Sequence, residues 1–329
     1  MARKHLIELP VVPSDPVGTP NSALPFPRDE RWHQKVQKPD WLRVKLRAGE
    51  SYDKIRKMTE GLRLNTVCQE ARCPNIFECW SEGTATFMVM GDTCTRACGF
   101  CNVKTGRPEA LDSEEPEHVA QAVEMLKLEH AVITSVDRDD LPDLGSGHFA
   151  AVIRAVRERN PQTKVEVLIP DFQGKEECLQ TILDARPDVL NHNTETVPRL
   201  HRRVRTRARY EWTLSVLRRA SEYRDKHFPE MFTKTGIMLG LGEALDEVLA
   251  TIQDIRSQGT DILTVGQYMR PTLKHLPVER FWTPEEFDQI GEEALKMGFK
   301  FVESGPLVRS SYHAGRHRHA ALKSGTSPA

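Results

Sequence analysis

Apolar residues along most of this chain follow two alternating patterns, one typical of buried strands and one typical of amphipathic helices. Short apolar runs, often β-branched, occupy residues 86–90, 131–134, 164–169, 189–191, 236–239, 262–265 and 299–302. Between them, apolar positions at helical spacing predict helices over 117–128, 149–159, 176–185, 212–227, 245–258 and 284–297. Strands that alternate with helices of this length predict a parallel sheet built from βα units.

The number of these units sets the expected architecture. Six or seven units are too few for a complete eight-stranded barrel. We therefore predict an α/β fold, a partial and open βα-barrel of about six units over residues 86–303. A doubly wound sheet is the alternative, but no Gly-x-Gly-x-x-Gly follows the first strand, which weakens a dinucleotide-binding interpretation.

The two ends of the chain lack this alternation. Residues 1–38 are rich in proline, which predicts an extended arm that is partly disordered. Residues 39–85 form an N-terminal extension in which apolar residues from Tyr52 to Met58 fall at helical spacing. Residues 304–329 form a C-terminal segment that we expect to end in a disordered tail.

Composition and the first residues exclude several classes of protein. Lys plus Arg is 46 and Asp plus Glu is 47, so the net charge of −1 argues against a nucleic-acid partner. No stretch approaches about 18 consecutive apolar residues, which argues against a membrane span. The basic first residues are followed by Glu8 and Pro10, so no secretion signal forms. We expect a cytoplasmic protein.

Six of the seven cysteines fall in one short stretch, in two groups of three. An odd number concentrated in this way argues against a disulfide framework. One set is C-x4-C-x5-C and the other is C-x3-C-x2-C, namely Cys68, Cys73 and Cys79, then Cys94, Cys98 and Cys101.

Thiolates at these spacings wrap a loop around a soft metal or an iron–sulfur cluster. Two structural zinc sites are the alternative, with His118 or His130 available as a further ligand. Three thiolates on a four-iron cluster leave one iron open, and an open metal position is a reactive one.

The second cysteine set lies in a segment that resembles a known superfamily. Residues 94–101 (CTRACGFC) resemble the cluster loop of radical S-adenosylmethionine (SAM) enzymes, and Phe100 fits the aromatic position before the last cysteine. Further segments resemble the lipoyl synthase family within it: 66–75 (TVCQEARCPN), 78–80 (ECW), 85–88 (ATFM), 104–108 (KTGRP), 134–141 (TSVDRDDL) and 309–312 (RSSY). Two loops depart from the family, at Phe77 and at 144–147.

The resemblance implies two [4Fe–4S] clusters. Cys94, Cys98 and Cys101 would hold the cluster that binds SAM. The auxiliary cluster would be held by the first cysteine set and, as fourth ligand, a serine of the last motif, that is by Cys68, Cys73, Cys79 and Ser310. Serine is a hard and unusual ligand for iron, so this bond should be the weakest of the four. The C-terminal segment must then fold back over the mouth of the barrel.

The family reaction inserts two sulfur atoms at C6 and C8 of an octanoyl group on a carrier lysine, with the auxiliary cluster as sulfur donor and one SAM used per sulfur. The resemblance therefore implies octanoylated carrier domains as substrates, of 2-oxoacid dehydrogenases and of the glycine cleavage H protein. It also implies a ferredoxin or flavodoxin as electron donor and an iron–sulfur carrier for cluster repair. A biotin-synthase-like sulfur inserter and a non-catalytic iron–sulfur electron carrier are the alternatives.

Polar residues at the ends of other predicted strands are further candidates, because βα-barrels place their sites there. We expect Asn191 and Glu195 to contact SAM, with a plain turn or helix cap as the alternative. Gln267 and Tyr268 could face the same cavity.

Four further features have less specific interpretations. The acidic residues around Arg138 predict a solvated loop bonded to this arginine, with a hard-metal site or a SAM contact as alternatives. An arginine run is either a solvated face or a docking surface for acidic carrier domains: Arg202, Arg203, Arg205, Arg207 and Arg209. Cys178 is expected to be a small buried residue on a helix. His317 and His319 are expected in a solvated end.

Overall fold

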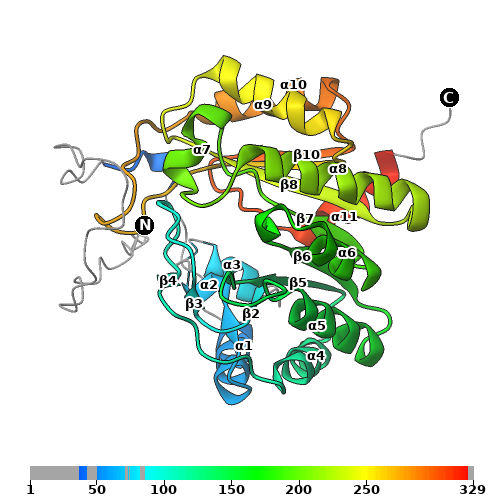
Figure 1. Ribbon diagram of the computed structural model, residues 1–329. Helices are drawn as coiled ribbons and strands as arrows, with labels where there is room; N and C mark the ends of the chain where they lie inside the picture. Colours follow the sequence, from blue (N-terminus) through cyan, green and yellow to red (C-terminus); the bar gives the residue numbers. More distant parts are fainter. Residues whose placement is uncertain (1–36, 43–49, 71–72, 74, 82–85, 325–329) are drawn as a thin grey trace.

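The computed structural model describes residues 37–42, 50–70, 73, 75–81 and 86–324 (Figure 1). Its main sheet has eight strands in the order β1-β2-β5-β6-β7-β8-β9-β10. Only β1 runs antiparallel to its neighbour β2, and every other pair is parallel. The strands are β1 (Asn65–Thr66), β2 (Thr86–Val89), β5 (His130–Ser135), β6 (Lys164–Leu168), β7 (Val189–Asn191), β8 (Phe232–Leu239), β9 (Ile262–Gln267) and β10 (Phe301–Gly305).

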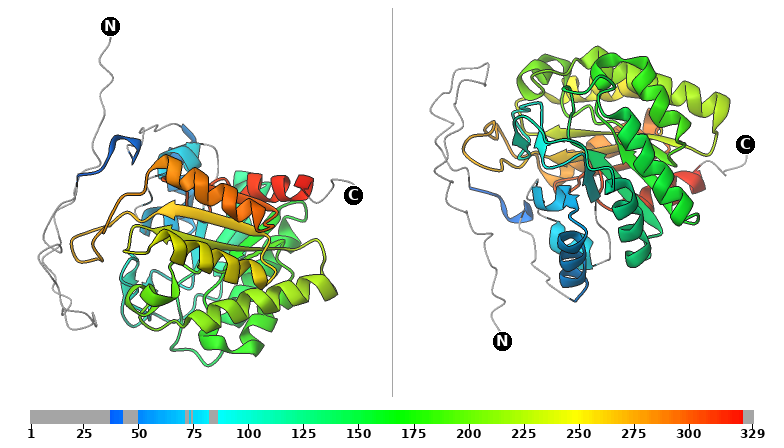
Figure 2. Two further views of the ribbon diagram at one scale, coloured as in Figure 1. Left: turned by 90° about the horizontal axis from the view of Figure 1, so that it is seen from above. Right: turned by 60° about the horizontal axis from the view of Figure 1, so that its bottom comes forward.

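Helices follow the parallel strands in turn and cover the outer face of the sheet (Figures 1 and 2). They are α4 (Glu115–Leu126), α5 (Ser146–Arg159), α6 (Glu176–Asp184), α7 (Pro198–Val204), α8 (Tyr210–His227), α9 (Leu245–Ser257) and α10 (Pro284–Lys296). The sheet does not close, since its edges are β1 and β10. The prediction of a partial, open barrel of βα units is thus confirmed.

Burial explains why apolar residues predominate in the strands and do not alternate with polar ones. All residues of β2, β7 and β9 are buried, as expected for parallel strands that helices cover from outside. Helix α10 begins with a capping box, in which the Thr283 hydroxyl accepts from Glu286 N and the Glu286 carboxylate accepts from Thr283 N. Such local signals fix where the helices begin.

The N-terminal extension adds short helices beside the first edge of the sheet. A 3-10 turn (Asp40–Leu42) precedes α1 (Glu50–Gly61), α2 (Val67–Glu70) and α3 (Ile76–Ser81). Ile55 of α1 and Trp80 of α3 pack with Cys68 in a small core of their own. The predicted extended arm lies outside the described residues, apart from Gln37 and Lys38.

The last described element is α11 (Ala314–Ser324), a helix that the sequence analysis did not predict. Ala321 packs with the first residues of three neighbouring strands, Val189 of β7, Phe232 of β8 and Ile262 of β9. Helix α11 therefore covers the end of the barrel opposite to the loops that carry the cysteines (Figure 1). The sequence predicts a disordered tail over 323–329, which is wrong for residues 323 and 324, since they belong to α11; residues 325–329 lie outside the described residues.

The prediction of a solvated end was wrong for His317. Its side chain is 1% exposed, stacks near Phe301 at 5.2 Å and bonds to Glu303 of β10. Glu303 also bonds to His313, at 3.3 Å. Two histidines thus fasten the start of α11 to the last strand.

Candidate active site: two cysteine loops at the barrel mouth

The second cysteine set lies in the loop between β2 and α4. Cys94 ends the short strand β3 (Thr93–Cys94), which pairs with β4 (Lys104–Thr105) and closes the loop at its base. Cys101 N donates to Cys98 O at 3.1 Å, so the last two cysteines share one tight turn. We call residues 93–106 the cluster loop.

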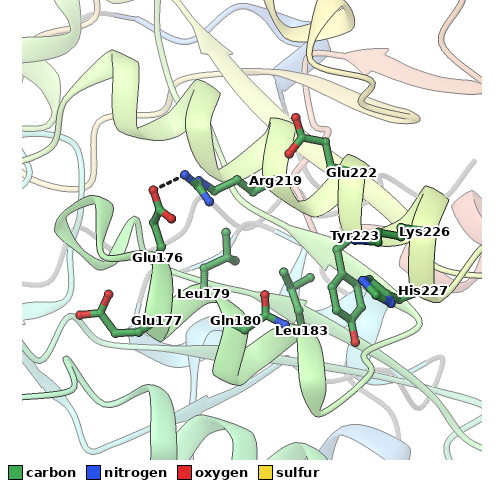
Figure 3. Close-up of a pocket in the computed structure, with 10 residues that line it drawn as sticks. All are labelled: Glu176, Glu177, Leu179, Gln180, Leu183, Arg219, Glu222, Tyr223, Lys226 and His227. Atoms are coloured by element: carbon green, nitrogen blue, oxygen red, sulfur yellow. Dashed lines mark hydrogen bonds and ion pairs between the residues drawn. The ribbon is translucent and has the colours of Figure 1, made fainter.

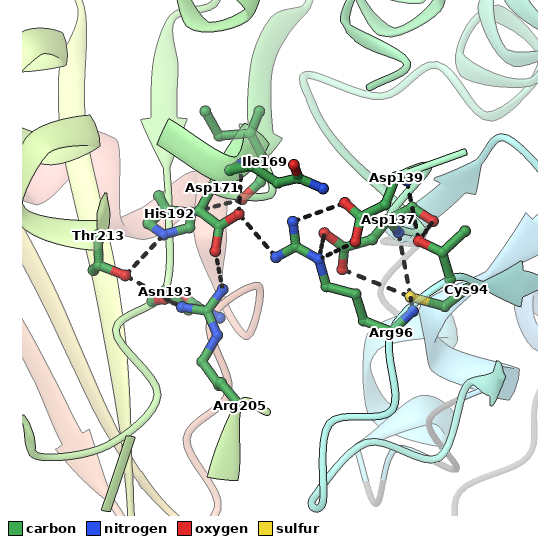
Figure 4. A network of polar contacts seen from close by, with 12 residues as sticks. Cys94, Arg96, Asp137, Asp139, Ile169, Asp171, His192, Asn193, Arg205 and Thr213 are labelled. Atoms are coloured by element: carbon green, nitrogen blue, oxygen red, sulfur yellow. Dashed lines mark hydrogen bonds and ion pairs between the residues drawn. The ribbon is translucent and has the colours of Figure 1, made fainter. Parts of the chain in front are cut away.

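Arg96, between the first two cysteines, holds the cluster loop to the barrel (Figure 4). Its guanidinium donates to both carboxylate oxygens of Asp139, at 2.8 and 2.9 Å, and to Asp171 Oδ1 at 2.8 Å. Asp137 lies 3.2 Å away on the same side as Asp139. Arg96 is 4% exposed, so these are buried, charge-assisted bonds, which are the strong class.

A second arginine continues this network. Arg205 lies 3.9 Å from Asp171 Oδ2 and donates to Asn193 O at 2.9 Å. Although burial alone would raise it, Arg96 and Arg205 lower the pKa of Asp171. The loops after β2, β5, β6 and β7 are therefore tied together through two cations and three carboxylates.

Gly99 lets the cluster loop pack against two further loops. Its N donates to Val204 O and its carbonyl accepts from Leu276 N, both at 2.9 Å. A Cβ at this position would lie 2.9 Å from Leu276 side-chain atoms, so the glycine permits this approach. His275 Nε2 also meets Cys101 O at 3.0 Å. Phe100 packs on the adjacent hydrophobic core.

The thiols of the cluster loop lie in surroundings that disfavour a lone thiolate. Burial, then the charge of Asp137, raises the pKa of Cys94 to about 12. Burial, then Glu195 and Asp137, raises the pKa of Cys101 to about 11, and burial also raises the pKa of Cys98. Three such thiols become ligands once a cation is bound among them.

The two residues predicted to contact SAM lie at the end of β7, beside the cluster loop. Asn191 is 1% exposed, and its Oδ1 has no hydrogen-bond partner among the described residues. Glu195 has a φ of 70°, a left-handed conformation held by Glu195 N to Gly236 O and Met238 N to Glu195 O. Backbone strain of this kind occurs most often at functional sites. Asn193 donates to Glu195 Oε1 at 3.1 Å.

The first cysteine set lies on α2, on α3 and on the turn between them. Cys73 N donates to Cys68 O at 3.0 Å, which joins the first two cysteines, and Cys79 N donates to Asn75 O at 2.9 Å at the start of α3. Burial, then the charge of Cys73, raises the pKa of Cys68 to about 11. Burial raises the pKa of Cys73 as well, and Arg309 opposes this shift.

The chain after β10 returns to this first cysteine set. We call residues 306–313 the strap. Asn75 Nδ2 donates to Leu307 O at 2.8 Å and Tyr312 OH donates to Glu78 Oε2 at 3.2 Å. Two hydrogen bonds thus join segments that lie more than 230 residues apart in the sequence.

Gly266 of β9 allows the strap to enter the barrel mouth. A Cβ at Gly266 would lie 2.2 Å from Val308 O and 3.4 Å from Arg309 Nη1. Since Val308 O is a backbone atom, no side-chain rotation could relieve that contact. Position 266 must therefore be glycine for the strap to take this path.

Ser310 lies in the strap between Arg309, which faces Cys73, and Tyr312, which binds Glu78. Ser310 is half-buried. Neither its hydroxyl nor that of Ser311 has a hydrogen-bond partner among the described residues, so neither caps the turn there. The structure brings the serine motif beside the first cysteine set, where the sequence resemblance requires it.

The donor chemistry of both sites suits iron–sulfur clusters. Each set offers three buried or half-buried free cysteines, and the first adds a serine oxygen from the strap. Within the described ranges, no three His, Cys, Asp or Glu side chains converge on a single metal ion. His130, considered as a zinc ligand, instead bonds to Glu166 at 3.1 Å, at the first residue of β5.

Local bonds occupy the polar atoms of two further candidates. Gln267 Nε2 donates to Tyr268 O and Arg280 O, Gln267 Oε1 accepts from Trp282 N, and Tyr268 OH donates to Leu276 O. They hold a loop in place.

The three aspartates of the acidic loop after β5 bind two different arginines. Arg138 pairs with Asp140 as predicted, at 2.8 and 2.9 Å, whereas Asp137 and Asp139 face Arg96. Cys178 is 1% exposed on α6, as expected.

Sequence analysis missed Arg96 and Asp171 and misread Arg205. Arg96 lies inside the cysteine motif, and Asp171 follows the end of β6, the position where a barrel places site residues. That signal could have identified Asp171. Arg205 was read with the other arginines as solvated or docking, but it is 9% exposed and faces Asp171.

A hollow of about 400 Å³ lies elsewhere, on the outer surface between α6 and α8 (Figure 3). It is lined by mixed charges, among them Glu176, Glu177, Arg219 and Lys226, and an Arg219–Glu176 pair bridges it. It contains none of the predicted site residues. The cysteine loops, not this hollow, define the candidate site.

Comparison with known sequences agrees with the two-loop arrangement. Residues 88–255 match the radical SAM superfamily, and residues 26–73 match the N-terminal domain of lipoyl synthase of the radical SAM family. Lipoyl synthase of Rubrobacter xylanophilus is 53% identical over 305 residues, which cover 93% of this chain and 92% of that protein. That of Symbiobacterium thermophilum is 54% identical, covering 92% of this chain and 93% of that protein.

This chain belongs to the lipoyl synthase family. A mitochondrial lipoyl synthase of Nematostella vectensis is also 52% identical, over 86% of this chain and 95% of that protein. As a member of the lipoyl synthase family the chain is a radical SAM enzyme, with a [4Fe–4S] cluster and SAM. The electron-carrier and biotin-synthase-like alternatives are therefore wrong.

Solved structures show the shared fold. Streptococcus suis SuiB bound to SAM superposes with a TM-score of 0.52 at 10% identity, over 76% of this chain and 60% of that chain. This chain therefore shares its fold with that structure. Among the described residues, no helix is both long enough and apolar enough to cross a membrane.

Proposed function

We propose that this chain inserts two sulfur atoms at C6 and C8 of an octanoyl group carried on a protein lysine. The observation that supports this most is the strap, which brings the serine motif to the first cysteine set through Asn75 and Glu78. A radical SAM enzyme that only cleaved SAM would need no second set of three cysteines.

When bound, the first cluster supplies the electron that cleaves SAM to methionine and a 5′-deoxyadenosyl radical, and the auxiliary cluster supplies the sulfur. In this proposal Cys94, Cys98 and Cys101 hold three irons of the first cluster, which leaves the fourth iron to SAM. Asn191 offers an unpartnered buried amide oxygen to SAM, and Glu195 offers a carboxylate next to Cys101. Phe100, within the same loop, is half-buried and packs on the adjacent hydrophobic core.

Cys68, Cys73, Cys79 and Ser310 hold the auxiliary cluster in this proposal. The serine oxygen is the hardest of these ligands and the easiest to release from iron. Among the described residues, two hydrogen bonds join the segment that carries Ser310 to the first cysteine set, and such bonds are weak enough for this ligand to be released. The chain would thus divide into an arm (1–38), an auxiliary-cluster extension (39–85), the barrel (86–303) and a serine-bearing end (304–329).

The partners follow from this chemistry. The substrates are octanoylated carrier domains, a ferredoxin or flavodoxin supplies electrons, and an iron–sulfur carrier restores the auxiliary cluster. The enzyme would act in the cytoplasm, where thiols stay reduced.

The test is anaerobic mass spectrometry of an octanoyl-lysine peptide incubated with reconstituted protein, SAM and dithionite. The expected product has gained two sulfur atoms, with about two 5′-deoxyadenosines formed per product molecule, because each inserted sulfur needs one hydrogen abstraction. A reaction without SAM is the control. Cleavage of SAM without any sulfur in the peptide would contradict the proposal.

A further inference from the structure

The segment from Pro198 to Tyr210 is strongly basic. It contains six arginines and no Asp or Glu. Arg199 pairs with Glu247 at 2.7 Å. Arg205 turns inward to Asp171, and Arg203 lies 3.6 Å from Glu279. The other three are exposed, and none has a carboxylate within 4.0 Å in the described part of the chain; we call Arg202, Arg207 and Arg209 the arginine rim.

The arginine rim surrounds a hollow of about 660 Å³ between α7, the start of α8 and the loops after β5 and β6. Arg209 lies over the Trp212 ring at 4.8 Å. Two carboxylates also line the hollow, but Asp139 is already bound by Arg96, which leaves only Glu211. Burial and then Arg205 lower the pKa of His201 to about 4, so it adds no charge at neutral pH. The hollow is therefore net positive.

This hollow opens on the same end of the barrel as the cysteines. Thr206, which lines it, donates to Ala97 O of the cluster loop at 3.3 Å. Asp139, on its other wall, binds Arg96 of the same loop. A molecule seated in the hollow would therefore lie against the outside of the cluster loop.

We propose that the arginine rim docks an acidic surface patch of the carrier protein that presents the octanoyl-lysine. This inference rests on the proposed function, since a substrate attached to a protein brings that protein's surface to the barrel mouth. Unpaired arginines next to a reaction site attract an acidic partner over a Debye length and favour one docking orientation. A merely solvated face would show no dependence on partner charge.

The test compares two substrates and two charge-matched variants. In Arg202→Gln/Arg207→Gln/Arg209→Gln, kcat/KM for an octanoylated carrier domain should fall about tenfold or more relative to kcat/KM for a short octanoyl-lysine peptide without acidic residues. The loss should lie in KM, and the salt dependence of the carrier reaction should weaken. The control Arg154→Gln/Lys226→Gln/Arg316→Gln removes the same charge from exposed positions outside the hollow and should leave the ratio unchanged.

Two results would overturn the docking inference. One is a rim variant whose ratio of kcat/KM for the carrier domain to kcat/KM for the peptide, and whose salt dependence, are both unchanged. The other is a control variant in which this ratio falls as much as in the rim variant. Absorbance of both clusters in each variant shows that the site is intact. If the unmodified protein inserts no sulfur into either substrate, the proposed function fails instead, so the two failures can be told apart.

Discussion

The two cysteine loops are built from the same kind of ligand but are fastened in different ways. The cluster loop is held from four sides by buried ion pairs and backbone hydrogen bonds, through Arg96 and Gly99. The strap lies on the barrel side of the first cysteine set, and within the described residues hydrogen bonds of Asn75 and Tyr312 join the two. Breaking a buried ion pair costs about 3–5 kcal/mol, whereas an ordinary hydrogen bond contributes about 1 kcal/mol.

This difference matches two different demands. A cluster that cleaves SAM in every turnover must keep one geometry, and a rigid loop provides it. A cluster that gives up sulfur must lose a ligand and be rebuilt, and a lightly fastened strap permits both. The fastening of each loop therefore suits the fate proposed for its cluster.

The largest expected effect is on the rigid loop. Cys98→Ala should lower 5′-deoxyadenosine formation by at least about 1,000-fold, because SAM cannot be reduced without this cluster. Anaerobic chromatography of the nucleoside product measures it. Cys178→Ala is the control, since Cys178 is a buried cysteine on α6 outside both sets. Normal cleavage in Cys98→Ala would show that this loop does not carry the SAM cluster.

Cys73→Ala should separate the two loops. Sulfur insertion should fall by at least about 1,000-fold, while SAM cleavage stays within about threefold of the unmodified rate. The same two products are quantified in one reaction. Loss of SAM cleavage with an intact first cluster would mean that the sets do not have separate roles.

Arg96→Gln should weaken the rigid loop strongly. It leaves the Asp139 carboxylate without its arginine and removes the nearer of the two cations of Asp171, which should lower the free energy of unfolding by about 3–5 kcal/mol. Arg138→Gln is the matched control and should cost clearly less, because its partner Asp140 is one-third exposed. Anaerobic urea unfolding gives both values. Equal losses of unfolding free energy in the two variants would show that Arg96 does not hold the cluster loop to the barrel.

The smallest effect is expected on the strap. Gly266→Ala places a Cβ against Val308 O, a contact of 2.2 Å that the strap must relieve by moving, at about 1–3 kcal/mol. Auxiliary-cluster occupancy should fall while the SAM cluster stays, as seen by iron analysis and SAM cleavage. Gly61→Ala is the control, since a Cβ there meets nothing within 4 Å. Unchanged occupancy in Gly266→Ala would contradict the path of the strap as a support of Ser310.

The barrel was predictable because its signals are local. Runs such as 131–134 and 262–265 consist of apolar residues with a single threonine each, and capping residues such as Thr283 mark where helices begin. Strand β8 begins at Phe232, four residues before the predicted start at 236. The prediction began too late because Thr233 and Lys234 are polar residues of the kind expected in a loop. Lys234 is nevertheless fully buried, since it donates to Glu166 at 2.7 Å.

Only those site residues that belong to a sequence motif could be predicted. The spacing of the cysteines and the serine motif identified candidate ligands, because both can be read from the sequence without knowledge of any tertiary contact. The sequence predicts a solvated position for Arg205 and for His317, which is wrong. Their charged partners, Asp171 and Glu303, lie on other elements and reach them only when the chain folds. Charge patterns along a chain cannot tell a solvated residue from one whose counter-ion arrives by tertiary packing.

The central claim is that one loop keeps its cluster and the other gives its cluster up. The direct measurement is iron per chain, in reconstituted protein and again after one turnover with an octanoyl-lysine peptide. Two four-iron clusters predict about eight irons before turnover and about four after it, with SAM cleavage still supported by what remains. Product formation with all eight irons retained, or a starting content near four, would contradict the account.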